Sequence, residues 1–340
     1  MEKITLSGLF PEEITELLEL GQNFRGKQIF KWISTGVSSF DEMTNLSLDL
    51  RKILSEKATV FTSFVSQKLV DPDGTIKLQI TLQDSLCIET VLLIDSEGRK
   101  TACVSCQAGC AMACAFCQTG KLGFARNLTA GEIVEQFLYL EKDCGKLDNI
   151  VFMGMGEPMM NLPEIRKAIS ILAHKDGRNL STRRITISTS GVIKGIYDLA
   201  DNGPAVRLAI SLTTADNELR NTLMPVNKGN PLSELSKAIK YYIDKTGKRC
   251  TLEAALLSGL NTTKESAKNI KKFVGNMPVH LNIIPWNPVE GLPYEEPTSQ
   301  ECHAFMGYLE ELGIKVTQRT RRGRKIGGAC GQLGKTIKIN

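Results

Sequence analysis

The sequence lacks several features that would point to a membrane or secreted protein. No stretch of about eighteen apolar residues occurs, as a membrane-spanning helix requires, and the N-terminus "MEKITLSGLFPEEITELL" has no continuous apolar signal segment. No repeat or low-complexity segment interrupts the chain. We therefore expect a cytoplasmic protein with no membrane partner.

Histidine is also scarce, whereas cysteine is not. The chain has three histidines, His174, His280 and His303, and ten cysteines among 340 residues. In a reducing cytoplasm ten cysteines are poor candidates for a disulfide framework, so clustered ones more often bind metal or do chemistry. A hydrophobic content of 42% allows a substantial core, and the length fits one large domain with a smaller one.

Positive charge is concentrated at the C-terminal end. The net charge of the chain is +5, and the segment from Leu312 to Asn340 has eight basic residues and no acidic one. The rest of the chain therefore has a net charge of about −3. The basic residues of this segment are Lys315, Arg319, Arg321, Arg322, Arg324, Lys325, Lys335 and Lys338. Such a run is either a solvated face or the footprint of a polyanion site, which makes nucleic acid a candidate partner.

The first 95 residues divide into a helical part and a β part. Residues 1–60 are predicted to form helices, since "PEEITELLELG" places Pro11 in a first turn and Gly21 at a stop. Residues 61–95 contain the alternating runs "TIKLQITL" and "CIETVLLI", bounded by the turn signals "DPDG" and "DSEG". This pattern predicts a small antiparallel β extension.

Residues 96–325 alternate between strand-like and helix-like segments. After a strand leading into Cys103, the apolar runs are "NIVFMGMG", "RRITISTSG", "AVRLAISLT", "CTLEAALLSG" and "VHLNIIPWNP". Strands that alternate with helices imply a parallel sheet, so the predicted fold class is α/β, a partial (β/α)6 TIM-like barrel. Its active site should lie at the carboxyl ends of the strands, and residues 326–340 should form a C-terminal segment.

The stretch "CVSCQAGCAMACAFCQTG" packs five cysteines into Cys103–Gly120. Cys110, Cys114 and Cys117 form a C-x3-C-x2-C pattern, and no fourth Cys or His follows at the spacing of a structural zinc site. Three thiolates on a short loop suit a [4Fe-4S] cluster with one iron open to an external ligand. A zinc site remains the alternative.

The motif "CAMACAFC", with Phe116 before its last cysteine, resembles the radical S-adenosylmethionine (SAM) superfamily. The resemblance implies a [4Fe-4S] cluster on the three cysteines, with the amino and carboxylate groups of SAM at the open iron. It also assigns polar groups at the predicted strand ends to SAM binding. These positions are Gly156, Glu157, Ser188, Ser211, Leu212, Thr213 and Asn287.

A narrower resemblance covers nearly the whole chain. The pairing of the cluster motif with "ACGQL" (Ala329–Leu333), plus Cys103 seven residues before Cys110, is similar to the RlmN/Cfr family of RNA adenine methyltransferases. The segments "FRGKQIFKWI", "FDEMTNLS", "MGMGEPMMNL" and "LNIIPWNP" resemble the RlmN branch. That branch implies methylation of adenine carbon 2 in 23S rRNA and tRNA, with Cfr-like carbon 8 chemistry as the alternative.

The family resemblance implies roles for three further residues. One SAM methylates Cys330, and a second SAM allows that methyl group to be joined to the base, which gives a covalent protein–RNA adduct. Glu89 then accepts the carbon 2 proton, and the thiol of Cys103 attacks the sulfur of Cys330. The cluster implies a low-potential electron donor, flavodoxin- or ferredoxin-like. From the residues alone, Glu89 could equally be an exposed strand carboxylate.

Departures from the family pattern leave the substrate open. Thr213 stands where the family usually has His, and the segment before Cys330 is basic and glycine-rich instead of acidic. A radical SAM enzyme acting on a peptide or small molecule, and a non-catalytic metal-stabilised RNA-binding module, are the competing readings. The first gives no reason for Cys103, Cys330 and the basic run together, and the second predicts a colourless zinc protein.

Overall fold

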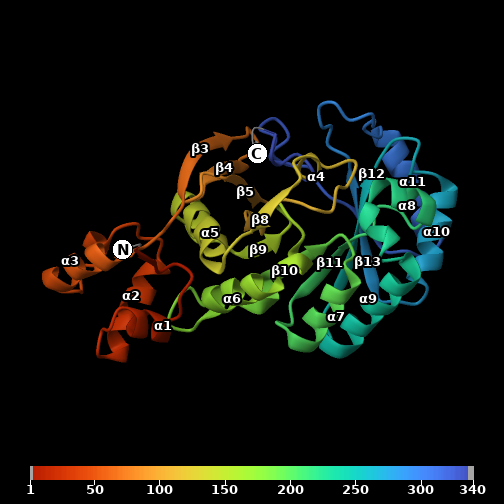
Figure 1. Cartoon of the computed structure of the whole chain (residues 1–340). Helices are drawn as coiled ribbons and strands as arrows, with labels where there is room; N and C mark the ends of the chain where they lie inside the picture. The colour runs from red at the N-terminus through yellow and green to blue at the C-terminus, as the bar shows by residue number, and fades with distance from the viewer. Residues whose placement is uncertain (1–2, 336–340) are drawn as a thin grey trace.

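The structure is a computed structural model that describes residues 3–335, so Lys338 of the basic run lies outside the described residues. Three helices form the N-terminal part: α1 (Pro11–Leu17), α2 (Asn23–Ile33) and α3 (Leu48–Lys57). They lie beside a short parallel pair, β1 (Ile4–Thr5) and β2 (Ala58–Thr59), away from the main sheet (Figure 1). Pro11 begins α1, and the Ser47 hydroxyl accepts the Leu50 N–H at the start of α3.

The N-terminal part is anchored to helix α5 (Ala130–Cys144) by a buried carboxylate. Glu135 accepts hydrogen bonds from the Ser7 hydroxyl at 2.7 Å and from the Ser63 backbone N–H at 3.0 Å. Burial raises the pKa of Glu135, and it outweighs these hydrogen bonds, which lower the pKa. Gly8 lies so close to Gly131 that a Cβ on Gly8 would come within 2.9 Å of the Gly131 nitrogen. This contact requires glycine and brings the two backbones together.

A single mixed sheet forms the body of the molecule. Within residues 3–335 it has ten strands in the order β14-β13-β12-β11-β10-β9-β6-β5-β4-β3. The antiparallel part is β3 (Phe64–Val70), β4 (Ile76–Thr81) and β5 (Cys87–Ile94). The parallel part is β6 (Lys100–Cys103), β9 (Asn149–Phe152), β10 (Ile185–Thr189), β11 (Arg207–Ser211), β12 (Cys250–Leu256), β13 (Val279–Pro285) and β14 (Val316–Gln318).

The α/β fold class is confirmed, with two refinements. Strands β3 and β14 lie at opposite ends of the strand order, so over the described residues the parallel part is an open, partial barrel. The antiparallel strands continue the same sheet, because β5 pairs with β6. β14 is a seventh parallel strand that the hydrophobic pattern did not predict, since it has only three residues, two of them exposed.

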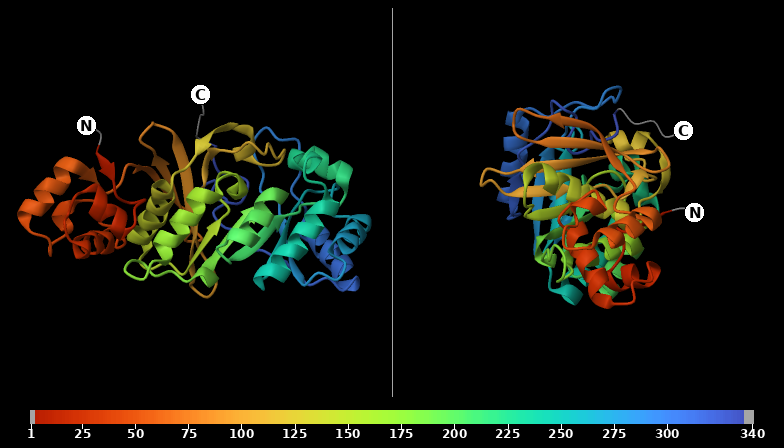
Figure 2. Two further views of the ribbon diagram at one scale, coloured as in Figure 1. Left: turned by 60° about the horizontal axis from the view of Figure 1, so that its bottom comes forward. Right: turned by 90° about the vertical axis from the view of Figure 1, so that its left-hand side faces the viewer.

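Helices connect the parallel strands and cover the sheet. They are α5, α6 (Leu162–Ala173), α7 (Ile193–Asn202), α8 (Asn217–Leu223), α9 (Leu232–Thr246), α10 (Lys264–Val274) and α11 (Ser299–Glu311). A small hairpin of β7 (Gln107–Gly109) and β8 (Phe124–Asn127), with α4 (Gln118–Lys121) inside it, follows β6. Figure 2 shows an elongated molecule, with the N-terminal helices at one end and the last helices at the other.

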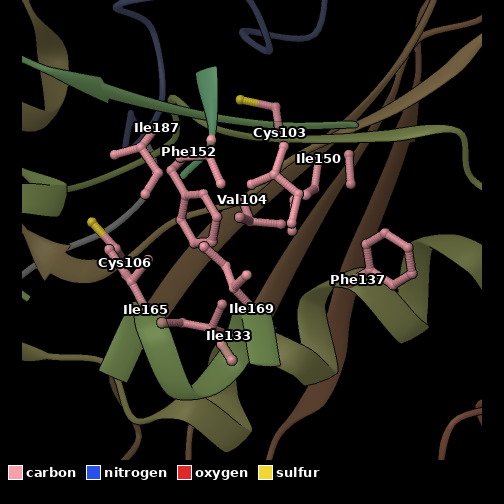
Figure 3. Close-up of a cluster of buried hydrophobic side chains, with 14 of the residues drawn as sticks. Cys103, Val104, Cys106, Ile133, Phe137, Ile150, Phe152, Ile165, Ile169 and Ile187 are labelled. Atoms are coloured by element: carbon pink, nitrogen blue, oxygen red, sulfur yellow. The ribbon is translucent and has the colours of Figure 1, made fainter. Parts of the chain in front are cut away.

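The core forms where α5 and α6 pack on the sheet. Ile133 and Phe137 of α5 and Ile165 and Ile169 of α6 are all buried against strand residues such as Phe152 (Figure 3). Each such side chain contributes about 1.5–3 kcal/mol by leaving water. No helix in the described part of the chain is long and apolar enough to span a membrane.

Candidate active site

A pocket lies at the carboxyl ends of the parallel strands, where the barrel prediction placed the active site. It brings together most of the residues that the sequence singled out. Those lining it are Cys110, Cys114, Cys117, Gly156, Glu157, Ser188, Ser211, Thr213, Asn287 and Cys330. Leu212, Cys103 and Glu89 are not in this lining. The roles of all these residues remain predictions, and their surroundings are described below.

The three motif cysteines lie on the loop between β7 and α4. The Cys110 backbone N–H donates to the Gly123 carbonyl at 2.7 Å, and the Cys117 N–H donates to the Cys114 carbonyl at 3.1 Å, which closes the loop on itself. Burial raises the pKa of each of the three thiols, that of Cys110 to about 12. Among the described residues, no group of three or more His, Cys, Asp or Glu side chains is arranged so that it could hold a metal ion.

Glu157 follows β9 and is buried against the loop after β10. Its Oε2 accepts from both the backbone N–H and the hydroxyl of Ser190 at 2.7 Å, and its Oε1 accepts the Met159 N–H at 3.0 Å. Burial raises the pKa of Glu157. A buried carboxylate in a pocket is a suitable partner for a ligand ammonium group. Ser190, which also lines the pocket, was not predicted, because a lone serine in "STSG" carries no distinct signal.

Arg220, on α8, holds the ends of two strands together. Its side chain is completely buried and donates to the carbonyls of Ser190 at 2.7 Å and of Leu212 and Ser211 at 3.2 Å. A fourth hydrogen bond joins it to the Asn227 side chain at 2.8 Å. Burial lowers the pKa of Arg220 to about 10. Sequence reasoning missed this residue, which does not line the pocket but holds the strand ends that form its wall.

The end of β11 turns sharply into the pocket. The backbone N–H groups of Leu212 and Thr213 both donate to the Glu253 carbonyl, at 2.9 and 3.1 Å. Thr213 has a φ of +59°, an unusual value for a β-branched residue. The Leu212 side chain is buried in the core, so a contact of this residue with a ligand would involve its backbone.

Asn287, after β13, links the pocket to the Cys330 loop. Its Nδ2 donates to the Cys330 carbonyl at 3.1 Å, while its Oδ1 is buried without a hydrogen-bond partner among the described residues. A buried unpaired acceptor in a pocket lining is an expected feature of a ligand site. Together with three thiols at iron–sulfur spacing, it shows that the residues present fit a [4Fe-4S] cluster and SAM.

The Cys330 loop is held against the end of the cysteine loop by two hydrogen bonds. The Gln118 N–H donates to the Gly331 carbonyl, and the Thr119 hydroxyl donates to the Leu333 carbonyl, both at 2.8 Å. Cys330 itself is exposed, as a residue that meets a macromolecular substrate must be. All ten cysteines are free thiols.

Cys103 lies at the end of β6, close to Cys330 and Arg319. Its side chain is at the edge of the hydrophobic cluster with its sulfur directed away from Ile150 (Figure 3). Burial raises the pKa of the Cys103 thiol to about 12, and the nearby Cys330 adds to this effect. Arg319, which also lines the pocket, opposes it. Sequence reasoning counted Arg319 only as part of the basic run.

Glu89 is buried on β5 with both oxygens occupied, so the alternative of an exposed strand carboxylate is wrong. Its Oε1 lies 2.9 Å from Lys77 Nζ, and its Oε2 accepts the Gly334 N–H at 2.7 Å. Lys77 is itself buried and was not predicted, because a lysine in an alternating strand normally faces water.

Much of the basic run is paired with acids. Arg321 and Arg324 both contact Glu296, and Arg319 lies 3.6 Å from Glu253. Outside the run, Arg126 pairs with Glu132 at 2.7 Å and with Asp84 at 2.5 Å. These pairs reduce the positive charge available to a polyanion. Arg183 and Arg184, just before β10, are exposed.

Comparisons with known protein families match two separate parts of the chain. Residues 104–273 match the radical SAM superfamily, and residues 5–60 match the ribosomal RNA large subunit methyltransferase N-terminal domain. A "Probable dual-specificity RNA methyltransferase RlmN" from Treponema denticola is 60% identical over 98% of this chain and 96% of its own length. The protein of the same description from Treponema pallidum (strain Nichols) is 53% identical, with 98% of each chain covered.

The fold also matches a solved structure over its full length. A radical SAM methyltransferase from Sphaerobacter thermophilus superposes with a TM-score of 0.93 at 37% sequence identity. The match covers 97% of this chain and 99% of that protein.

Proposed function

The chain belongs to the RlmN family of radical SAM enzymes, and on that premise we propose that it methylates carbon 2 of adenine in 23S rRNA and tRNA. The observation that carries the proposal is the joining of Cys330 to the pocket. Asn287 holds the Cys330 carbonyl, and the same pocket is lined by Cys110, Cys114 and Cys117. A substrate base that reached Cys330 would therefore stand over the cofactor site.

Family membership implies a [4Fe-4S] cluster and SAM. Cys110, Cys114 and Cys117 would hold the cluster, and Glu157 and the free Oδ1 of Asn287 would bind polar groups of SAM. When bound, these cofactors supply the one-electron chemistry that an electron-poor aromatic carbon such as adenine carbon 2 requires. Cys110 through Cys117 lie on a closed loop, and Arg220 fixes the neighbouring strand ends, so the site is held rigidly.

Three side chains do the remaining chemistry in this proposal. Cys330 carries the methyl group as S-methylcysteine and becomes bridged to adenine through its methylene carbon. This bridging removes one hydrogen atom from the methyl group and one electron from the adduct, both of which the bound cofactors would accept. Glu89 accepts the carbon 2 proton. The Cys103 thiolate then attacks the Cys330 sulfur, so that a disulfide forms and the sulfur–carbon bond breaks. The electron pair of that bond passes to the methylene carbon, which takes a proton and becomes the methyl group of the product.

The partners follow from the same chemistry. We propose that the N-terminal helical domain (residues 1–60) contacts RNA together with the exposed part of the basic run. The radical SAM core would span residues 96–325, and the C-terminal segment would present Cys330. A low-potential flavodoxin- or ferredoxin-like protein would reduce the cluster in the cytoplasm.

The proposal is tested by comparing two cysteine variants in cells. Cys103→Ala should still join RNA to Cys330 but fail to release it, and so accumulate a protein–RNA adduct. Cys330→Ala should form no adduct, because it has no methyl carrier. A denaturing gel, run with and without ribonuclease, distinguishes the two. If Cys103→Ala released methylated RNA at the wild-type rate, the proposed mechanism would be wrong.

A further inference from the structure

Lys77 and Glu89 form a buried ion pair beneath the segment that carries Cys330. The register of β4 and β5 sets Gln79 opposite Glu89, so Lys77 is a diagonal neighbour of Glu89 on the same face of the sheet. The Lys77 Nζ lies 2.9 Å from Glu89 Oε1, and the two side chains are only 5% and 1% exposed. A pair this deep is strongly coupled, because removing one partner leaves an uncompensated buried charge.

Within residues 3–335 the side chain of each member of the pair has one further partner, and both partners are backbone groups of the Cys330 segment. Lys77 Nζ donates to the Gly327 carbonyl at 3.2 Å, and the Gly334 N–H donates to Glu89 Oε2 at 2.7 Å. These contacts lie three residues before and four residues after Cys330. One ion pair therefore clamps both ends of the loop that carries the proposed methyl carrier.

Neighbouring acids extend the clamp but do not replace it. The turn between β3 and β4 holds the start of the segment, since Asp71 accepts the Lys325 N–H and Asp73 accepts the Gly323 N–H, both at 2.9 Å. In the described structure Lys77 does not line the pocket. Its contacts in the described structure are with Glu89 and with the Cys330 segment, so we assign its effect to these two partners.

We propose that Lys77 is a positioning residue for the methylation reaction. Its ammonium group joins the Glu89 carboxylate to the Cys330 segment. This inference rests on the proposed function, in which Glu89 accepts a proton. Lys77 holds Oε1 in the ion pair, whereas the contact of Oε2 is the Gly334 N–H, so we assign Oε2 as the oxygen that receives the proton. In this assignment the C-terminal end of the loop shifts to give the substrate base access to Oε2.

The test measures methyl loading and RNA release separately. Lys77→Met, Lys77→Arg, Glu89→Gln and the double variant Lys77→Met/Glu89→Gln are compared with the wild type. Lys68→Met serves as the matched control, because Lys68 lies on adjacent β3 and pairs with Asp143 at 2.9 Å while 43% exposed. Peptide mass spectrometry follows methylation of Cys330, and a denaturing gel follows the protein–RNA adduct.

We expect Lys77→Met to load the methyl group within about twofold of wild type, because loading does not use Glu89. Release of RNA should slow by about tenfold or more, since the Glu89 carboxylate loses the side chain that positions it for proton removal, and the adduct should accumulate. Lys77→Arg should restore release, and Lys68→Met should behave like the wild type. Adding Lys77→Met to Glu89→Gln should have no further effect on release.

Cys103→Ala separates failure of this inference from failure of the proposed function. If Cys103→Ala forms no adduct, the proposed function itself is wrong. If that adduct forms but Lys77→Met releases RNA normally, or slows loading and release equally, the inference is overturned. Should Lys77→Met not fold, the double variant decides, because it leaves no buried charge unpaired. If the double variant releases RNA at the rate of Glu89→Gln, the inference is supported. If the double variant releases RNA more slowly than Glu89→Gln, the inference is contradicted.

Discussion

The side-chain amide of Asn287 donates to the backbone carbonyl of Cys330 at 3.1 Å, while its own oxygen is buried with no hydrogen-bond partner in the part of the chain that the structure describes. One side chain thus touches both the proposed methyl carrier and the proposed SAM site. The two functions of Asn287 can be separated by substitution, because aspartate keeps an acceptor and loses the donor.

Asn287→Ala should weaken SAM binding about tenfold, the effect of one buried hydrogen bond of about 1.4 kcal/mol. Asn287→Asp should bind SAM better than Asn287→Ala and yet hold the Cys330 loop less well. Gln332→Ala is the control, since Gln332 contacts the Pro288 carbonyl at 3.0 Å beside the same loop. Equilibrium binding of SAM is measured for all three variants. If Gln332→Ala weakened SAM binding as much as Asn287→Ala, loosening of the Cys330 loop alone would be responsible.

Replacing Cys110, Cys114 or Cys117 with alanine should remove the brown chromophore and most of the bound iron from anaerobically purified protein. A cluster held by three thiolates has no spare protein ligand. Cys106→Ala is the matched control, since Cys106 is a buried thiol just before Cys110 and off the ligand spacing. Iron and sulfide analysis should show full content in Cys106→Ala, and a colourless zinc-containing wild type would contradict the assignment.

The buried guanidinium of Arg220 should be essential for stability. Arg220→Met leaves three carbonyls near the strand ends without their donor, so the free energy of unfolding should fall by about 3 kcal/mol. The exposed Arg184→Met should change it by less than about 0.5 kcal/mol. Urea denaturation measures both variants. Equal stabilities would show that water replaces the Arg220 contacts.

Release of RNA by Cys103 should accelerate with pH. Burial raises the pKa of this thiol to about 12, so at neutral pH it is almost entirely protonated. The reactive thiolate fraction then rises about tenfold per pH unit well below the pKa. The single-turnover rate of adduct release should therefore rise steadily from about pH 7 to about pH 9, as far as the protein stays folded. A plateau below about pH 8 would show that Cys103 ionises far more easily than its burial indicates.

How much of this site could be predicted depends on whether the signal is local. The spacing of Cys110, Cys114 and Cys117 and the motif around Cys330 are short-range patterns, and the pocket brings these residues together. The turn signals "DPDG" and "DSEG" do separate β3 from β4 and β5 from β6. Such features need only a few neighbouring residues to be recognised.

The residues that escaped prediction are those whose role comes from long-range packing. Lys77 escaped because it meets Glu89, itself a predicted residue, only through the register of β4 and β5, which the sequence does not specify. Arg220 looks like an ordinary helical surface charge, although burial under two strand ends makes it a structural centre. Arg319 was counted with the basic run, while its location in the pocket follows from β14, a strand too short to predict.

The most direct test of the central claim is mass spectrometry of nucleosides from a strain that lacks its own adenine carbon 2 methyltransferase. The wild-type chain should restore 2-methyladenosine in 23S rRNA and in tRNA, and Cys330→Ala should restore it in neither. If the wild-type chain, purified with a full cluster, produced 8-methyladenosine or no methyladenosine at all, the proposed carbon 2 methylation would be contradicted.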